Sequence, residues 1–344
     1  MLVTSWISSR IGAKKTLLIG LALIVVFALF CALSGSVDAI IGFRAGWGLG
    51  NALFISTALA TIVGSATGGS SAAIILYEAA LGLGIAIGPL LGGLLGEQSW
   101  RAPFFGVVVL MAIAFLAVLV LLRGPAEKRT PVPFSAPFKA LGNPAIAVLA
   151  TAAFFYNIGF FILLAFSPFP LGFGAMGIGF TFFGWGIALA VTSVRVAPLL
   201  MRRMSHTRVI LTVLPLLAVD LIVAGFLVES STALVVCIVV GGLLLGVMNT
   251  VLTEAVMEAT DLPRPVASSA YSSVRFLGGA IAPPLAAALW HAFDATVPYL
   301  VAAAAVLVAA LTIFLGRRIL AHIDEEPDDA TVEDAEAILL GDAA

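Results

Sequence analysis

Charged side chains inside long apolar segments are the residues of this sequence best suited to do chemistry. A charge near the middle of a bilayer costs about 2.5–3.5 kcal/mol on insertion scales, so it usually faces a partner or a water-filled cavity. A buried carboxylate can pair with a cation or carry a proton, and a buried guanidinium can pair with a carboxylate or bind an anionic group. The residues concerned are Arg44, Glu78, Arg195, Asp220 and Arg275.

The composition shows that these charges sit in a membrane protein. Hydrophobic residues make up 61% of the 344 residues, charged residues only 10%, and the mean hydropathy is +1.16. These values exclude a soluble globular domain, and continuous apolar segments of about 20 residues exclude a β-barrel. The two cysteines lie within apolar segments and the three histidines are scattered, so neither a disulfide nor a metal site is predicted.

The apolar segments predict an all-α polytopic membrane protein. Residues 1–6 resemble the end of a helix, and ten complete spans follow. These spans are 15–36, 38–62, 71–96, 101–123, 143–166, 176–200, 208–229, 231–256, 266–290 and 296–316.

The basic residues predict the orientation of these spans. Of the 17 Lys and Arg, Arg101 alone falls in a loop on one side, and thirteen fall on the other. By the positive-inside rule the thirteen are cytoplasmic, together with the acidic tail 317–344. The thirteen are Arg10, Lys14, Lys15, Arg123, Lys128, Arg129, Lys139, Arg202, Arg203, Arg208, Arg264, Arg317 and Arg318.

A glycine-rich stretch organises the span 71–96. Gly84, Gly88 and Gly92 are four residues apart, so they share one helix face on which a second helix can approach closely. Pro89 removes a backbone donor and is expected to kink the helix. On its own this glycine pattern is as typical of an ordinary seam between packed helices as of a functional motif.

The two halves of the sequence resemble each other. The segment 84–89 matches 278–283 at an offset of 194 residues, and the basic loop around Arg10 matches the one around Arg202 at an offset of 192. The segment 124–142, rich in proline and charge, lies between them. The sequence therefore predicts an internal repeat of two bundles joined by a cytoplasmic linker.

Two helices carry a resemblance to a known family. Residues 84–93, read as Gly-x-x-x-Gly-Pro-x-x-Gly-Gly and followed by Ser99-Trp100-Arg101, resemble the antiporter motif in the fifth helix of proton-driven drug exporters of the major facilitator superfamily. Residues 267–280 resemble the eleventh helix of the 12-helix multidrug exporters. The resemblance implies two pseudo-symmetric six-helix bundles. It also implies that helix 1 and most of helix 2 are absent from this N-terminally truncated chain, through a misplaced start, a fragment or a real truncation.

Two further motifs match this superfamily in part. Arg10, Gly12 and Lys14 match the signature loop between helices 2 and 3, but Ser9 stands where the family has an aspartate that latches the cytoplasmic side. Arg44 lies in a segment similar to the fourth-helix motif Arg-x-x-x-Gly-x-Gly, whose arginine is implicated in proton coupling. The alternative for Arg44 is a side chain that extends to the membrane surface.

The resemblance also suggests roles for the other charged residues. Family packing brings helix 5 against helix 8, so Glu78 and Arg195 would form an ion pair that closes a cytoplasmic gate; alternatively Glu78 carries protons. Arg275 would bind an anionic group or pair with a carboxylate such as Asp220 or Glu254. Asp220, in peripheral helix 9, is a packed polar residue or a proton site.

Helices 4, 7 and 10 line the substrate cavity in this family. Their polar positions here, with Glu254 towards one end, are Asn51, Tyr156, Asn157, Asn249 and Glu254. Nearby phenylalanines would suit amphipathic substrates, although such residues more often serve packing; they are Phe154, Phe155, Phe160 and Phe161. The close-packed pivot between the bundles would comprise Gly84, Gly88, Pro89, Gly92, Gly93, Gly278 and Pro283.

Together these observations predict a monomeric, multi-pass transporter of the plasma or inner membrane that exports small amphipathic compounds by proton antiport. Residues 1–123 form the incomplete N-terminal bundle, 143–316 the C-terminal bundle and 317–344 a cytoplasmic tail. The sequence contains no nucleotide-binding loop, catalytic triad or nucleic-acid motif, so neither an enzyme nor a cofactor is expected. The alternatives are a proton-coupled importer on the same fold and a non-transporting remnant that binds a membrane partner.

Overall fold

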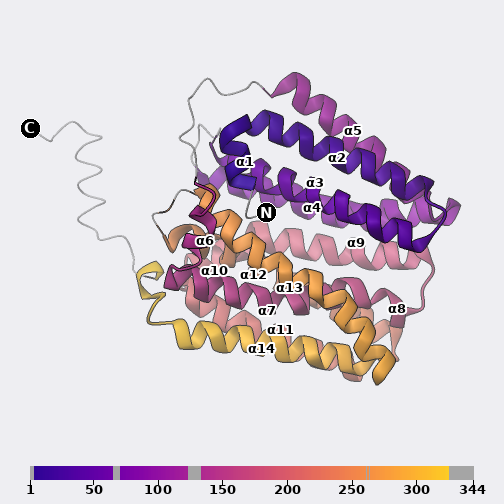
Figure 1. Cartoon of the computed structure of the whole chain (residues 1–344). Coiled ribbons are helices and arrows are strands. Elements are labelled where there is room, and N and C mark those ends of the chain that lie inside the picture. Colours follow the sequence, from indigo (N-terminus) through magenta and orange to yellow (C-terminus); the bar gives the residue numbers. More distant parts are fainter. Residues whose placement is uncertain (1–3, 65–69, 123–132, 261, 263, 325–344) are drawn as a thin grey trace, which may run out of the picture.

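The computed structural model describes residues 4–64, 70–122, 133–260, 262 and 264–324. Within these ranges every regular element is helical, and the long helices lie side by side (Figure 1). The helices are α1 (Thr4–Ile11), α2 (Ala13–Leu33), α3 (Val37–Gly64), α4 (Ser70–Gln98), α5 (Ala102–Leu121), α6 (Ala136–Ala140), α7 (Pro144–Phe166), α8 (Pro168–Leu171), α9 (Ala175–Val191), the π-helical turn η1 (Thr192–Val196), α10 (Ala197–Met201), α11 (His206–Phe226), α12 (Ser231–Glu258), α13 (Arg264–Ala292), α14 (Thr296–Gly316) and the 3₁₀ turn η2 (Ala321–Ile323).

Helix starts follow from the local sequence. The side chain of Asn143 accepts hydrogen bonds from the backbone N–H groups of Ala145 and Ile146, and Pro144 occupies the first turn, where a missing N–H costs nothing. Ser230 caps α12 in the same way by accepting from the N–H of Ala233. These caps fix where two of the long helices of the C-terminal half begin.

The long helices fit the ten expected spans. In the described part of the chain, nine helical stretches are long and apolar enough to cross a membrane. The remaining long helix, α3, also has the length of a span, and it carries the polar residues Asp38, Arg44 and Asn51. The span expected at 176–200 consists of α9, η1 and α10 in succession.

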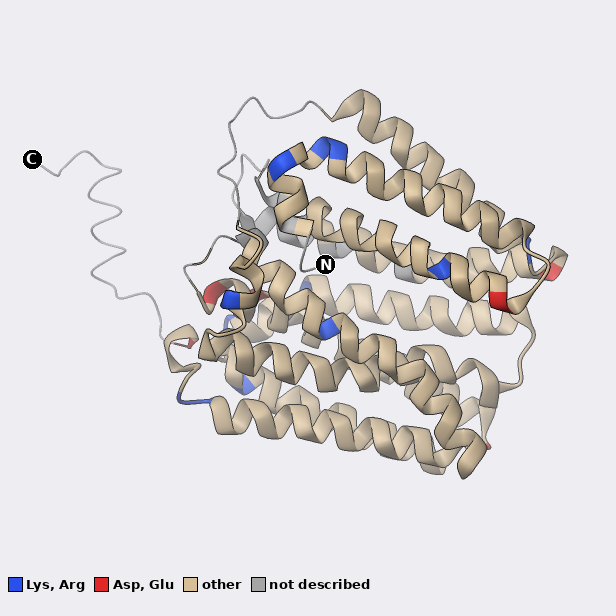
Figure 2. Ribbon diagram, in the orientation of Figure 1, with Lys and Arg blue, Asp and Glu red and all other residues tan. Residues whose placement is uncertain are grey.

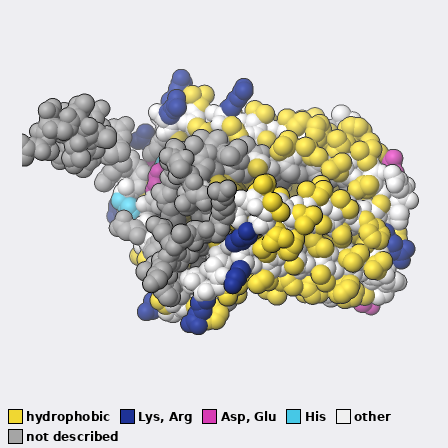
Figure 3. Space-filling model, turned by 90° about the horizontal axis from the view of Figure 1, so that it is seen from above, with side chains coloured by type: hydrophobic (Ala, Val, Ile, Leu, Met, Phe, Trp, Pro, Cys, Tyr) yellow, Lys and Arg dark blue, Asp and Glu magenta, His cyan; other side chains and the backbone are white. Residues whose placement is uncertain are grey.

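The surface of the molecule is that of a protein in lipid. Large apolar side chains are exposed along the helices, and α5 buries none of its residues. Figure 3 shows a broad, mostly apolar area, with most of the dark blue basic side chains towards one end. Figure 2 shows most Lys and Arg at the same end of the helices, where α11 begins and α12 ends. We refer to it as the basic end.

The helices form two groups. Helices α1 to α5 pack among themselves, with α2 between α3 and α5, and helices α6 to α14 surround a large buried core (Figure 1). The most extensive contact between the groups joins α4 to α9, and smaller contacts join α13 to α1 and α3. The linker expected at 124–142 is described only from residue 133, and the acidic tail only to residue 324.

Candidate functional site

A polar cluster lies where α7, α12 and α13 meet. The hydroxyl of Tyr156 donates a hydrogen bond of 2.7 Å to Oδ1 of Asn249, and Nη2 of Arg275 donates one of 2.6 Å to the same oxygen. Tyr156 and Asn249 are buried, whereas Arg275 is partly exposed. Hydrogen bonds from charged groups contribute about 1.5–3 kcal/mol, so Arg275 holds this cluster in one geometry.

Close packing of α7 against α13 positions the cluster. A Cβ added to Gly278 would overlap the backbone carbonyl of Phe154, and one added to Gly279 would lie 2.6 Å from the ring of Phe161. Phe160 is buried, with its ring centroid 5.8 Å from that of Trp185. The phenylalanines of α7 therefore serve packing, as the more common use of such residues predicts.

Arg275 places a positive charge in mostly apolar surroundings. Its Cζ lies 5.7 Å from the ring centroid of Phe276 and 6.0 Å from that of Tyr271, within the range of cation–π attraction. Among the described side chains the ion pair within 4.0 Å joins His206 to Glu258, so Arg275 does not pair with Asp220 or Glu254. The expected pairing with these two carboxylates is wrong, because the amide oxygen of Asn249 accepts instead, and binding of an anionic group stays a prediction.

Two other predicted polar residues are buried inside the C-terminal group. Asp220 on α11 is 8% exposed, and a Cβ added to Gly241 on α12 would lie 3.2 Å from its Oδ2. Neither this oxygen nor the side-chain amide of Asn157 has a hydrogen-bond partner among the described residues. Asp220 is therefore enclosed between packed helices.

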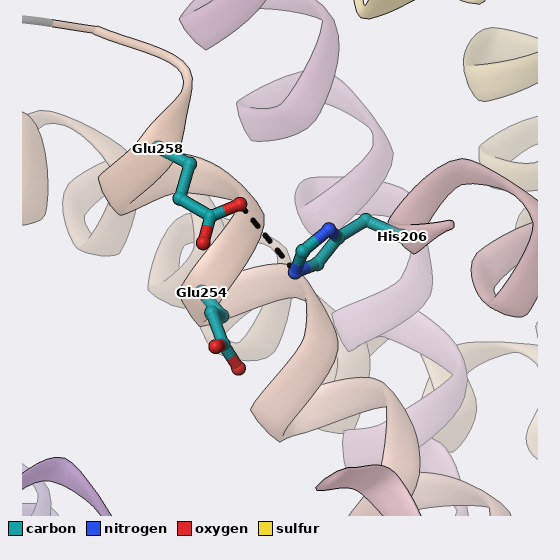
Figure 4. Close-up of side chains that lie close together, drawn as sticks. All are labelled: His206, Glu254 and Glu258. Carbon is teal, nitrogen blue, oxygen red and sulfur yellow. Dashed lines mark ion pairs between the residues drawn. The ribbon is translucent and has the colours of Figure 1, made fainter. Parts of the chain in front are cut away.

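Glu254 does not belong to the polar cluster. Its carboxylate instead lies near the carboxylate of Glu258 and the imidazole of His206 at the basic end (Figure 4). One oxygen or nitrogen atom from each of the three side chains lies within 4.8 Å of the other two. Sequence spacing could not reveal this group, because His206 precedes Glu254 by 48 residues. The expected cavity role of Glu254 stays a prediction.

The structure describes one of the two residues of the expected cytoplasmic gate, Arg195. As the family packing implies, α4 lies against α9 and η1, and Arg195 is exposed on η1. The side chain of Glu78 lies outside the described residues, so the Glu78–Arg195 pair stays a prediction.

Arg10 and Arg44, the other two arginines predicted to act in gating or proton coupling, lie near tryptophan rings. The exposed Arg10 has its Cζ 4.6 Å from the ring centroid of Trp6, and the exposed Arg44 has its Cζ 5.3 Å from that of Trp47. The exposure of Arg44 is compatible with a side chain that extends towards the membrane surface, and its role in proton coupling stays a prediction. Asn51 is half-buried on α3.

The packing face of α4 differs from the expected one. No described atom lies within 4 Å of a Cβ added to Gly84, Gly88 or Gly92. The face that touches α9 carries Gly82, Ala86 and Gly93, and the backbone of Pro89 also contributes to it. Its partners on α9 are Ala175, Gly179, Gly186 and Ala190.

In the described residues the Gly-Pro segments of α4 and α13 have no extensive contact with each other, and their role as a pivot stays a prediction. Gly93 and Gly278 each lie in a close contact, but with different neighbours: Ala175 of α9 for the first and Phe154 of α7 for the second. Pro283, inside α13, is partly buried.

Sequence reasoning missed a hydrogen-bonded seam between η1 and α12. The hydroxyl of Ser193 donates to the carbonyl of Gly246 at 2.9 Å, and that of Thr250 donates to the carbonyl of Ser193 at 3.4 Å. The signal for it is the small-xxx-small pair Gly242 and Gly246, which allows close helix approach.

Comparisons with known proteins decide the family. Residues 1–260 match the sequence profile of the Major Facilitator Superfamily. The chain belongs to this superfamily. It is 50% identical over 323 residues to the multidrug efflux protein YfmO of Bacillus subtilis (strain 168), which covers 94% of this chain and 82% of that protein. The superfamily assignment makes the chain a membrane transporter and not an enzyme.

Other relatives are more distant. The tetracenomycin C resistance and export protein of Streptomyces glaucescens is 36% identical over 130 residues, which is 37% of this chain and 24% of that protein. The crystal structure of the human organic anion transporter MFSD10 superposes with a TM-score of 0.71 at 18% identity, covering 91% of this chain and 79% of that one. The superposition shows that the two share the major facilitator fold.

Proposed function

We propose that this chain exports small amphipathic compounds across the cell membrane in exchange for protons. The observation that carries the proposal is the 50% identity to a multidrug efflux protein over 94% of the chain. Because that similarity extends through both groups of helices, it favours the same kind of transport and disfavours import on the same fold.

The cluster of Tyr156, Asn249 and Arg275 is the proposed contact for the polar part of a substrate. It joins three helices of the C-terminal group and leaves Arg275 partly exposed. A few converging polar groups in apolar surroundings are typical of small-molecule sites. The positive charge of Arg275 would also hold a negatively charged group or respond to proton movement nearby.

Alternating access would use the seam between α4 and α9. This seam is the most extensive contact between the two groups of helices, and its small residues allow the backbones to meet. Rocking of one group against the other about a site in the middle of the membrane is the general mode of such transporters. The basic end would face the cytoplasm by the positive-inside rule.

Dye accumulation in bacteria that lack their own drug exporters tests the proposal. Cells that express the wild-type chain should accumulate less ethidium than cells with an empty vector, and an uncoupler should abolish the difference. Arg275→Gln should lose export, whereas the matched control Arg317→Gln, which alters an exposed arginine at the basic end, should retain it.

Each contrary result has a distinct meaning. Higher accumulation than in control cells would indicate an importer, and equal accumulation with the protein present in the membrane would favour the non-transporting remnant. Export that survives the uncoupler would refute proton coupling. For the gate, Glu78→Gln and Arg195→Gln should have less than additive effects on export, and additive effects would show that no pair exists.

A further inference from the structure

Three side chains with metal-binding atoms converge at the basic end, away from the Tyr156–Asn249–Arg275 cluster. Glu254 and Glu258 are one turn apart on α12, so both project from the same helix face. His206 is the first residue of α11, and Figure 4 shows its imidazole pointing towards these two carboxylates. One ligand atom from each residue lies within 4.8 Å of the other two.

The imidazole nitrogen that faces the carboxylates lacks a hydrogen bond. Nε2 of His206 is buried and has no hydrogen-bond partner among the described residues, although Oε2 of Glu258 is 3.6 Å away. The ion pair at 3.6 Å thus leaves Nε2 without a hydrogen bond, and a buried polar atom in that state costs about 1–3 kcal/mol. A cation bound between Nε2 and the carboxylates would supply the missing partner.

A further carboxylate lies beside the three residues, and an open cavity gives a cation a route of entry. Asp324 lies near Glu258, and its Oδ1 accepts a hydrogen bond from the backbone N–H of Thr207, the residue after His206. Glu258, which is 46% exposed, also lines an open cavity of about 510 Å³. Lys139 and His322 are the other charged or titratable residues that line this cavity.

We propose that His206, Glu254 and Glu258 bind one divalent transition-metal ion, with Zn²⁺ as the fitting example. Imidazole nitrogen favours Zn²⁺ and its neighbours in the first transition row, whereas Mg²⁺ and Ca²⁺ prefer oxygen ligands alone. Three protein ligands leave a coordination position for water, which the cavity beside Glu258 can supply. The bound ion joins the start of α11 to the end of α12.

The test is Zn²⁺ binding by the purified full chain in detergent after chelator treatment, measured by titration calorimetry. We expect one Zn²⁺ per chain and a higher midpoint of thermal unfolding with Zn²⁺ than with chelator. Loss of an outer-shell partner lowers metal affinity about 10–100-fold, so H206A, E254Q and E258Q should each weaken binding at least tenfold. The control H291A removes an exposed histidine on α13 and should bind as the wild type does.

Unchanged affinity in H206A, or no stoichiometric Zn²⁺ binding by the wild type, would overturn the proposal and leave an ordinary His206–Glu258 ion pair. Each variant is compared with the wild type in chelator first, because equal unfolding midpoints there show that the fold is intact. If H206A alone fails to fold, the two glutamine variants decide. Dye export is measured separately, so failure of the metal site and failure of the export proposal are distinguishable.

Discussion

Replacing Gly93 by Ala should separate α4 from α9. A Cβ on residue 93 would lie 2.7 Å from the backbone carbonyl oxygen of Ala175, whereas ordinary van der Waals contact begins at 3.4 Å. The helices must therefore move apart by about 0.7 Å, because a backbone atom cannot rotate away as a side chain can. Overpacking of this kind costs about 1–3 kcal/mol.

The adjacent Gly92 provides the matched control. No described atom lies within 4 Å of a Cβ added there, so Gly92→Ala adds the same methyl group one residue away without a clash. Both variants gain the same helix propensity, since alanine favours a helix over glycine by about 1 kcal/mol. The difference between the two variants therefore isolates the contact with α9.

Unfolding in mixed detergent micelles measures that difference. We expect Gly93→Ala to lower the free energy of unfolding by about 1–3 kcal/mol relative to Gly92→Ala. We also expect Gly93→Ala to reduce dye export, because the seam joins the two groups of helices. Equal stability of the two variants, or a greater loss in Gly92→Ala, would refute the packing face and restore the one that the Gly84–Gly88–Gly92 spacing predicts.

Three further predictions use the same unfolding and export assays. Tyr156→Phe removes a donor to Asn249 and should lower the free energy of unfolding by about 1 kcal/mol; no change would mean that the hydrogen bond does not hold the cluster. Asn143→Ala removes the cap of α7 and should cost about 1 kcal/mol, whereas Ser135→Ala, at a helix start without a side-chain cap, should cost little. Asp220→Asn should retain dye export, because an amide of the same shape fits the enclosed space between α11 and α12; loss of export by a stable variant would instead make Asp220 a proton site.

The positions of the long helices could be predicted from the sequence, because apolar segments of sufficient length require helices in a membrane. The contact of α4 with α9 followed from the family resemblance. The face of α4 that makes this contact could not be predicted. Small residues occur on two faces of α4, and the choice depends on where α9 carries Gly179, Gly186 and Ala190.

The polar contacts were predicted less well, because they depend on distances between helices. Arg275 is expected to bind an anionic group or to pair with a carboxylate such as Asp220 or Glu254, and among the described residues it donates to the amide oxygen of Asn249 and to neither of these carboxylates. The family resemblance places Glu254 on a helix that lines the substrate cavity, near its cytoplasmic end. Its carboxylate meets His206 because α11 begins where α12 ends, which is a property of the packed bundle and not of either segment.

The two Gly-Pro segments resemble each other in sequence but serve different contacts. The segment in α4 meets the other group of helices through Gly93 and Ala175, so this contact must change if the groups rock against each other. The segment in α13 meets α7 within its own group through Gly278 and Phe154, so this contact can stay fixed. In such a mechanism the same small-residue pattern would serve a moving seam in one half and a fixed seam in the other, because a glycine pattern sets only how closely a neighbour can approach.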